Sequence, residues 1–167
     1  SYKYVLPIIA VLKKEIILQQ ERSDFLAYKK ECVQSESVFV HVRRGDYVNA
    51  GPGLQTLNEE YYKNAIEIIK TKVRNPFFVI FSDDITWVKE TLGGLFLQAI
   101  YMDKCDLEDY EEFALMTSCK HGIIANSTFS WWSALLLDNK DACVIAPKDW
   151  KNIYLKGDVN VCPPSWM

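Results

Sequence analysis

Residues 38–42, with the sequence VFVHV, decide the fold of this chain. The run is short, apolar on both faces and rich in β-branched and aromatic residues, which is typical of a strand buried inside a parallel sheet. The polar residues 43–46 that follow it mark the point where this strand leaves the sheet. Onward from here, short β-runs alternate with segments of helical periodicity.

The next elements can be placed from their caps and breakers. Asn58 is a good N-cap for a helix that Pro76 stops, and residues 77–81 then form a second strand. Asp83 or Asp84 caps a helix that runs to Leu92 and that glycines end. Further strands are expected at residues 100–101, 123–125 and 142–146, and further helices at residues 110–117, closed by Gly122, and 129–137.

This alternation predicts βαβ units and therefore a Rossmann-like α/β fold, a parallel sheet flanked by helices. Ahead of the first strand, the spacing of apolar residues from Ile9 to Tyr28 predicts a single amphipathic helix over residues 8–30. We therefore divide the chain into residues 1–37, a connecting helix, and residues 38–167, the Rossmann-like domain.

Composition narrows the class of protein. A length of 167 residues suits about one domain, and 49% apolar with 25% charged residues excludes a disordered chain. The net charge of −3 argues against a nucleic-acid surface and against a polybasic membrane patch. No apolar stretch is long enough for a membrane span. The apolar run at residues 4–10 is cut short by charges, which makes it a poor signal peptide.

The cysteines show no metal or disulfide pattern. They are odd in number, far apart and without a Cys-x-x-Cys pair, so we expect small core residues in a reducing compartment. The five are Cys32, Cys105, Cys119, Cys143 and Cys162. Because Ser1 is not a natural start, we also expect this chain to be a fragment.

The first candidate site is HVRRGDY at residues 41–47, because ligands of open parallel sheets bind at the carboxyl ends of strands. Alternation along the strand puts His41 and Arg43 on one side and points Arg44 away. One interpretation is an internal ion pair, for example between Arg44 and Asp46. The other is a phosphate site, since a guanidinium holds two phosphate oxygens in one plane.

Several phosphate-binding motifs are absent from the sequence, and their absence limits the kind of phosphate site that it can form. The sequence has no P-loop, and Gly51-Pro52-Gly53 does not make a dinucleotide fingerprint. It also has no Asp-x-Asp pair for a metal on a nucleotide sugar. Asp83 and Asp84 could ligate a metal, but adjacent carboxylates at a helix start more often cap it. A bound pyrophosphate would then be neutralised by arginine and by helix N-termini.

The second candidate site is NSTFSWW at residues 126–132, again between a strand end and a helix start. Hydroxyls and free amides there suit a phosphate or a ribose. An N-cap followed by two core tryptophans is an equally good interpretation from spacing alone.

Together these motifs resemble glycosyltransferase family 11, the α-1,2-fucosyltransferases, and the bacterial branch most. The likeness rests on ordered segments from about residue 38 to the end: residues 41–47, 81–84, 115–121, 124–132, 146–150 and 164–166. It implies the donor half of a two-Rossmann (GT-B-type) enzyme. Such an enzyme transfers L-fucose from GDP-L-fucose to a galactose-terminated glycan, with inversion and without a metal or other cofactor.

The resemblance also assigns roles. Arg43 would hold the β-phosphate and stabilise the leaving GDP, and would be the catalytic residue. The GDP-fucose-binding residues would be His41, Arg43, Arg44, Glu112, Asn126, Ser127, Thr128 and Phe129. Arg44 would either brace the loop or add a phosphate contact. Glu112 stands where the family usually has Asp. Asp46 is a candidate general base, although its place after the arginines favours a structural role.

The resemblance further implies an amino-terminal acceptor half that this chain lacks, with the connecting helix at residues 1–37 as its remnant. The net charge predicts no nucleic-acid partner. We expect a cytoplasmic location, with peripheral association at the inner face of a bacterial membrane left open. Two alternatives remain: a non-catalytic GDP-sugar-binding domain, and a fucosyltransferase of the α-1,6 or protein-O-fucosyl type. The segment at residues 126–132 favours the α-1,2 family over the latter.

Overall fold

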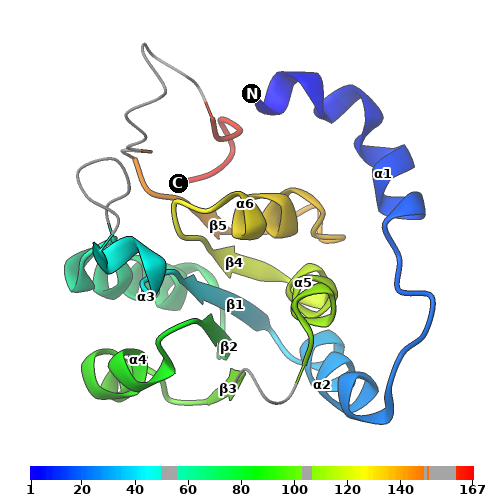
Figure 1. The fold of residues 1–167 in the computed structure, drawn as a ribbon. Helices are drawn as coiled ribbons and strands as arrows, with labels where there is room; N and C mark the ends of the chain where they lie inside the picture. The colour runs from blue at the N-terminus through cyan, green and yellow to red at the C-terminus, as the bar shows by residue number, and fades with distance from the viewer. Residues whose placement is uncertain (50–55, 103–106, 149, 151–160) are drawn as a thin grey trace.

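A computed structural model describes residues 1–49, 56–102, 107–148, 150 and 161–167 (Figure 1). In this part of the chain, five strands form one parallel sheet in the order β3-β2-β1-β4-β5. The strands are β1 (Ser37–Val42), β2 (Phe77–Ser82), β3 (Ala99–Met102), β4 (His121–Ile123) and β5 (Val144–Ile145). The predicted α/β fold with a parallel sheet is confirmed.

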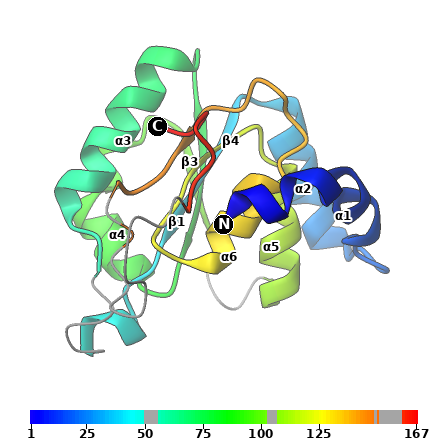
Figure 2. The same cartoon turned by 90° about the horizontal axis from the view of Figure 1, so that it is seen from above.

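Helices cover both faces of the sheet (Figures 1 and 2). The α-helices are α1 (Ile9–Glu15), α2 (Ser23–Gln34), α3 (Glu59–Lys72), α4 (Ile85–Thr91), α5 (Asp109–Ser118) and α6 (Thr128–Leu135). Short 3-10 turns are η1 (Tyr2–Tyr4), η2 (Leu6–Ile8), η3 (Asp46–Asn49) and η5 (Gly93–Leu95). Helices α3 and α4 lie on one face, and α2, α5 and α6 lie on the other.

Strand β1 is buried on both sides because its residues alternate between the two cores. Val38, Val40 and Val42 pack with α3 and α4. Phe39 packs with α2, α5 and α6. The same alternation places His41 on the face of Phe39, the face that carries the candidate site.

Two predicted caps are present. The Asn58 side chain accepts a hydrogen bond from the Tyr61 backbone N–H at 3.0 Å, at the start of α3. Of the two aspartates considered for α4, Asp84 is the cap and accepts from the Trp87 N–H at 3.1 Å. Asp83 does not cap α4, and it lies instead at the candidate site.

The single helix predicted over residues 8–30 is wrong, because two helices stand there. α1 ends at Glu15 and Ile16 leaves the helical region (φ −88°, ψ 82°), while α2 begins after an extended Arg22. Arg22 donates two hydrogen bonds of 2.8 Å to the Glu111 carboxylate. This contact pins the start of α2 to the start of α5, and a tertiary contact of this kind overrides local helix propensity.

Gly122 does not close a helix as predicted. Helix α5 ends at Ser118, and Gly122 lies in the middle of β4, where a Cβ atom would be 2.5 Å from the Phe39 ring. Glycine is thus required for close packing against β1 and not for a turn. The strand predicted at residues 123–125 accordingly starts earlier, at His121, and β5 is shorter than the predicted 142–146.

Cys32 and Cys119 are buried core residues, with sulfur atoms 3.7 Å apart and no disulfide between them. Cys143 and Cys162 are only partly buried. Cys105 and the Gly51–Gly53 segment lie outside the described residues. No helix in the described part of the chain is long and apolar enough to cross a membrane. The division at residue 37 stays a prediction, and residues ahead of it, such as Phe25, are buried in the core.

Candidate functional site

A cavity of about 720 Å³ lies at the carboxyl ends of β1 and β2 and at the amino ends of α5 and α6. This is the edge where parallel α/β sheets bind ligands. Its lining residues are His41, Arg43, Asp46, Tyr47, Ser82, Asp83, Leu107, Glu108, Asp109, Glu112, Ser127, Thr128 and Phe129. The two stretches singled out from the sequence, which are far apart along the chain, therefore meet at one cavity.

Most of the predicted site residues line this cavity: His41, Arg43, Glu112, Ser127, Thr128 and Phe129. Arg44 and Asn126 are not among the lining residues, and Asn126 is buried. Tyr47 and Ser82 lie in segments that the sequence analysis singled out, but they were given no role there. Sequence reasoning missed Leu107, Glu108 and Asp109, which carry no motif of their own and reach this edge only through the fold.

Arg43 is the cation of the cavity. Its Nε lies 3.2 Å from Asp83 Oδ2, and its Nη2 lies 2.9 Å from Asp46 Oδ1. The guanidinium carbon also lies 5.6 Å from the centre of the Tyr47 ring. The side chain is 37% exposed, so one edge of the guanidinium remains accessible to a ligand.

Arg44 takes the opposite direction. Its Nε lies 3.2 Å from Asp84 Oδ2, and its guanidinium carbon lies 4.0 Å from the centre of the Trp87 ring. The side chain is 19% exposed and covers the start of α4. The ion pair considered between Arg44 and Asp46 is therefore wrong, because Asp46 pairs with Arg43. Of the two roles considered for Arg44, this geometry fits bracing.

Asp83 joins the two strand ends. Its Oδ1 accepts a hydrogen bond from the Arg44 backbone N–H at 2.8 Å, while Oδ2 faces Arg43. A Cβ on Gly45 would lie 2.8 Å from Asp83 Oδ2, so glycine is required for this close approach. The Asp83 carboxylate thus contacts Arg43 and the Arg44 N–H. The Asp84 carboxylate contacts the Arg44 side chain and caps α4. Among the described residues, no three His, Cys, Asp or Glu side chains are grouped so as to hold a metal ion.

His41 is a buried, neutral wall of the cavity. Its pKa is lowered to about 4, mainly by burial; Asp83 opposes this shift and the nearby Arg43 charge adds to it. Its buried Nδ1 has no hydrogen-bond partner within the described structure. The ring centre lies 5.8 Å from that of Phe129. At neutral pH His41 is therefore an uncharged hydrogen-bonding group that adds no charge to the cavity.

The amino end of α6 forms the facing wall. Ser127 is the N-cap residue, and its side chain makes no capping hydrogen bond to the helix. Ser127, Thr128 and Phe129 at this helix start line the cavity, and the first amides of a helix suit an anion. Of the two tryptophans expected in the core, Trp131 is buried and Trp132 is partly buried. Ser127 and Thr128 line the cavity, and their binding of a phosphate or a ribose stays a prediction.

The amino end of α5 supplies acidic groups. Glu108, Asp109 and Glu112 line the cavity. Glu111 instead turns inward to Arg22, and its pKa is lowered mainly by the hydrogen bond from the Glu108 backbone N–H, with Arg22 contributing. The cavity therefore has a cationic side at Arg43 and an acidic side at α5.

Tyrosines of α3 fix the strand ends beneath the site. Tyr61 Oη donates to the Ile124 carbonyl at 2.7 Å, and Tyr62 Oη donates to the His41 carbonyl at 3.4 Å. Burial raises the pKa of Tyr61 well above its usual value, so the hydroxyl stays protonated and can donate. These contacts hold β1 and β4 at the carboxyl edge.

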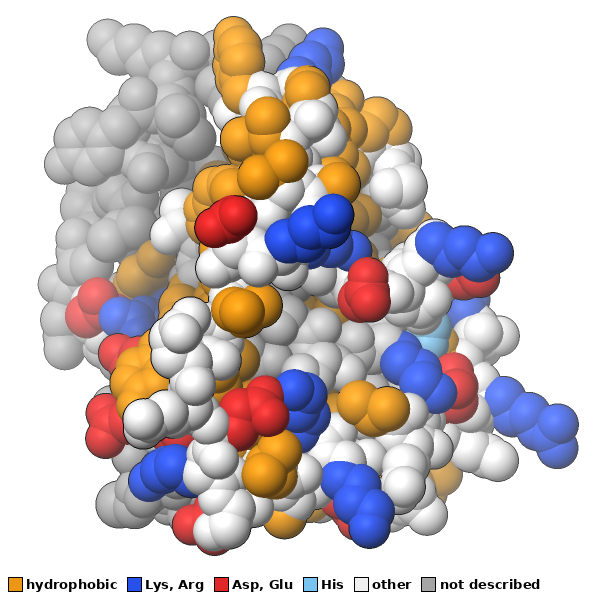
Figure 3. Space-filling model, turned by 90° about the vertical axis from the view of Figure 1, so that its right-hand side faces the viewer, with side chains coloured by type: hydrophobic (Ala, Val, Ile, Leu, Met, Phe, Trp, Pro, Cys, Tyr) orange, Lys and Arg blue, Asp and Glu red, His pale blue; other side chains and the backbone are white. Residues whose placement is uncertain are grey.

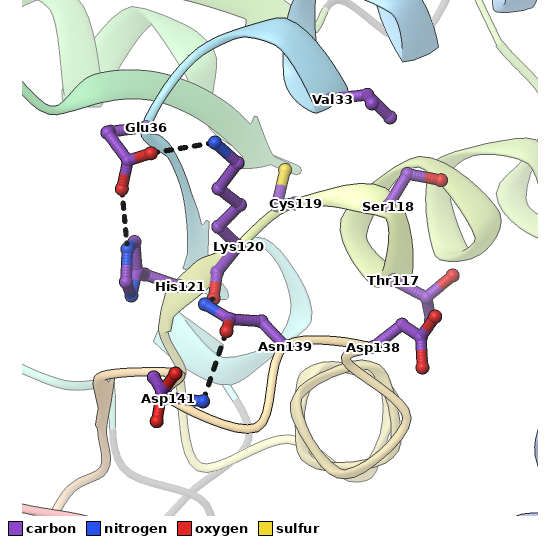
Figure 4. A pocket seen from close by; sticks show the side chains of 10 residues that line it. All are labelled: Val33, Glu36, Thr117, Ser118, Cys119, Lys120, His121, Asp138, Asn139 and Asp141. Atoms are coloured by element: carbon purple, nitrogen blue, oxygen red, sulfur yellow. Dashed lines mark hydrogen bonds and ion pairs between the residues drawn. The ribbon is translucent and has the colours of Figure 1, made fainter.

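A second cavity, of about 670 Å³, lies at the opposite, amino-terminal edge of β1 and β4 (Figure 4). Its polar groups bind one another: Glu36 lies 2.7 Å from Lys120 and 3.5 Å from His121. The His121 Nδ1 accepts a hydrogen bond from the Cys143 N–H at 3.0 Å. These contacts join the strands to one another, so we place the candidate site at the carboxyl edge.

Comparison with known proteins identifies relatives of this chain. Residues 14–167 match the family model of Glycosyl transferase family 11. An alpha-1,2-colitosyltransferase from Escherichia coli is 35% identical over 137 residues, which cover 80% of this chain and 47% of that protein. A galactoside alpha-(1,2)-fucosyltransferase 2 from Sus scrofa is 28% identical over 125 residues, covering 71% of this chain and 37% of that protein.

A solved structure shares the fold. The crystal structure of POFUT1 in complex with GDP-fucose superposes with a TM-score of 0.51 at 17% identity, covering 81% of this chain and 50% of that chain. The chain thus spans about half the length of the proteins it matches. Family model, relatives and the resemblance of the motifs all agree that the chain belongs to glycosyl transferase family 11.

Proposed function

We propose that this chain is the donor-binding half of a galactoside α-1,2-fucosyltransferase. The whole enzyme would transfer L-fucose from GDP-L-fucose to a galactose hydroxyl, with inversion. The observation that carries the proposal is that Arg43 and the amino end of α6 line the same cavity. An acceptor-binding half outside this chain would complete the enzyme.

The cationic side of the cavity suits the diphosphate. Negative charge develops on GDP as the fucosyl bond breaks, so a fixed guanidinium there stabilises the transition state more than the ground state. The α6 amides add partial positive charge at the same place. Because Arg43 and these amides supply the countercharge, we propose that GDP binds without a metal ion.

The acidic side suits the nucleoside. Carboxylates accept hydrogen bonds, and a guanine ring and a ribose both offer N–H or O–H donors. Glu108, Asp109 and Glu112 lie at the end of α5 that faces the cavity. Neutral His41 would add one uncharged hydrogen bond between the two sides. The relatives' names include both fucosyl and colitosyl transfer, so a colitosyl donor belongs among the substrates to be tested.

Transfer demands more than donor binding. The acceptor hydroxyl must be aligned with the anomeric carbon opposite the leaving GDP, and such positioning is worth roughly 7 to 11 kcal/mol of barrier. We propose that the acceptor half supplies most of this alignment. The isolated chain should then bind GDP but transfer little fucose. A cytoplasmic location and peripheral membrane association stay predictions.

Calorimetry tests the donor site. GDP titrated into the chain in excess EDTA should bind, and UDP should bind more weakly because the acidic side selects the base. Absence of GDP binding would refute the donor site, and binding that appears only with Mn²⁺ would refute the metal-free proposal. GDP-fucose and lactose then test transfer, with the chain alone and joined to an acceptor half. Binding without transfer in the joined protein would favour a non-catalytic GDP-sugar-binding domain.

A further inference from the structure

Arg43 carries two carboxylate partners in this structure, and the structure holds them very differently. The difference predicts which partner yields when a ligand phosphate arrives. This inference rests on the proposed donor site and adds the exchange by which that site accepts a diphosphate.

Asp83 is the fixed partner. Its side chain is only 10% exposed, and its two oxygens serve different groups, the Arg44 backbone N–H and the Arg43 Nε. Gly45 approaches so closely that even a Cβ would meet the carboxylate. Moving Asp83 would strip a partly buried N–H of its acceptor, which is costly. Asp83 therefore keeps Arg43 oriented whether or not a ligand is present.

Asp46 is the loosely held partner. Its side chain is 61% exposed, lies 2.9 Å from Arg43 Nη2 and lines the cavity. It stands on η3, a turn of four residues whose Val48 N–H bonds to the Arg44 carbonyl at 2.8 Å. Exposed ion pairs of this kind add little stability, so releasing Asp46 costs little.

We propose that Asp46 is a placeholder for the ligand's phosphate. In this structure its carboxylate contacts Nη2 of Arg43, and both side chains line the cavity. An incoming diphosphate displaces Asp46 from Nη2, while Asp83 stays on Nε. The guanidinium thus keeps an anionic partner throughout. The measured GDP affinity then reflects the phosphate contact that Arg43 gains less the Asp46 contact that it loses. Tyr47, next along the same turn, moves with Asp46.

The exchange makes an unusual prediction, since removing a residue from the site improves binding. Asp46→Asn should bind GDP about two- to fivefold more tightly than the wild type, which corresponds to losing one exposed competing ion pair. Asp46→Ala should do the same. Guanosine, which has no phosphate, should bind the wild type and Asp46→Asn equally. Asp83→Asn should weaken GDP binding, because it releases the fixed end of Arg43.

Asp141→Asn is the control for the removal of one carboxylate charge. Asp141 is exposed and lines the second cavity, at the opposite edge of the sheet. At about 0.15 M salt, charges more than roughly 8 Å apart are largely screened. Asp141→Asn should therefore leave GDP binding unchanged.

Calorimetry with GDP and guanosine on these variants decides the matter. Tighter GDP binding by both Asp46 variants, absent in Asp141→Asn and absent with guanosine, supports the exchange. Unchanged or weaker GDP binding by both Asp46 variants, with GDP still binding the wild type, overturns it and leaves the donor site standing. Failure of the wild type and every variant to bind GDP overturns the donor site and the exchange together.

Discussion

Replacing each of the two adjacent arginines by alanine should separate ligand binding from stability. Arg43 faces the cavity, whereas Arg44 lies against the Trp87 ring and Asp84. Arg43→Ala should therefore act mainly on GDP affinity, and Arg44→Ala mainly on the folded state. The two variants remove the same charge from neighbouring positions, so each is the other's control.

The size of the Arg43 effect follows from its contacts. Hydrogen bonds to charged groups contribute about 1.5 to 3 kcal/mol. Part of this gain is offset because the phosphate displaces the exposed Asp46 pair, which is worth about 0.2 to 1 kcal/mol. The remainder, about 1 to 2 kcal/mol, corresponds to GDP binding that is about 5- to 30-fold weaker in Arg43→Ala. Arg43→Lys keeps the charge and should fall between the two.

The Arg44 effect combines a cation–π contact with a partly buried ion pair. The cation–π contact is worth about 0.5 to 1 kcal/mol, and the ion pair with the packed side-chain stem contributes a similar amount. A loss of about 1 to 2 kcal/mol lowers Tm by about 2 to 8 °C in a domain of this size. GDP affinity should stay within about threefold of the wild type.

Calorimetry and thermal unfolding of both variants provide the test. The expected ranking is opposite for the two quantities: Arg43→Ala has the larger loss of affinity, and Arg44→Ala the larger loss of Tm. If Arg44→Ala weakens GDP binding as much as Arg43→Ala without lowering Tm, both arginines contact the ligand. The assignment of opposite faces to the two side chains would then be refuted.

Three further predictions concern the rest of the molecule. Since His41 has a pKa of about 4 when folded and about 6.5 when unfolded, the unfolded state takes up more protons between these values. Stability is therefore full above pH 6.5 and falls by about 2 to 3 kcal/mol toward pH 4, and urea unfolding of His41→Asn should lose this part of the pH dependence. Gly122→Ala overpacks against Phe39 and should lower Tm by about 2 to 12 °C, whereas Gly94→Ala, with no atom within 4 Å of its Cβ, should leave Tm unchanged. Figure 3 shows hydrophobic side chains gathered over α1 and the residues ahead of it, and Val11→Lys with Ile17→Lys should reduce self-association in light scattering without lowering Tm.

Sequence reasoning succeeded wherever the signal was local. The β-branched run of β1, the Asn58 cap and the aspartate cap of α4 each depend on a few neighbouring residues. The alternation of strands and helices then predicted a parallel sheet, and the rule for its carboxyl edge placed the site. Strand periodicity also predicted that His41 and Arg43 face one way and Arg44 the other.

Sequence reasoning failed where distant residues decide the structure. The break between α1 and α2 depends on Arg22 reaching Glu111, which is 89 residues away. The requirement for glycine at position 122 comes from the close approach of the Phe39 ring on the neighbouring strand. Local propensity carries none of this information. The pair considered between Arg44 and Asp46 was wrong for a local reason, because the turn after β1 brings Asp46 back to Arg43, three positions before it.

The balance of charge in the cavity explains why recognition must be divided between two sides. Among its described lining residues, five carry carboxylates and only Arg43 carries a guanidinium. A field of this sign repels a bare diphosphate, so Arg43 and the α6 amides cannot by themselves attract one strongly. The proposed nucleotide donor would overcome the repulsion, because its base and ribose would give the α5 carboxylates donors to bind while its phosphates reach the cationic side. The acidic lining therefore works against free anions and in favour of a ligand that is a hydrogen-bond donor at one end and an anion at the other. The leaving group of the proposed reaction has this form.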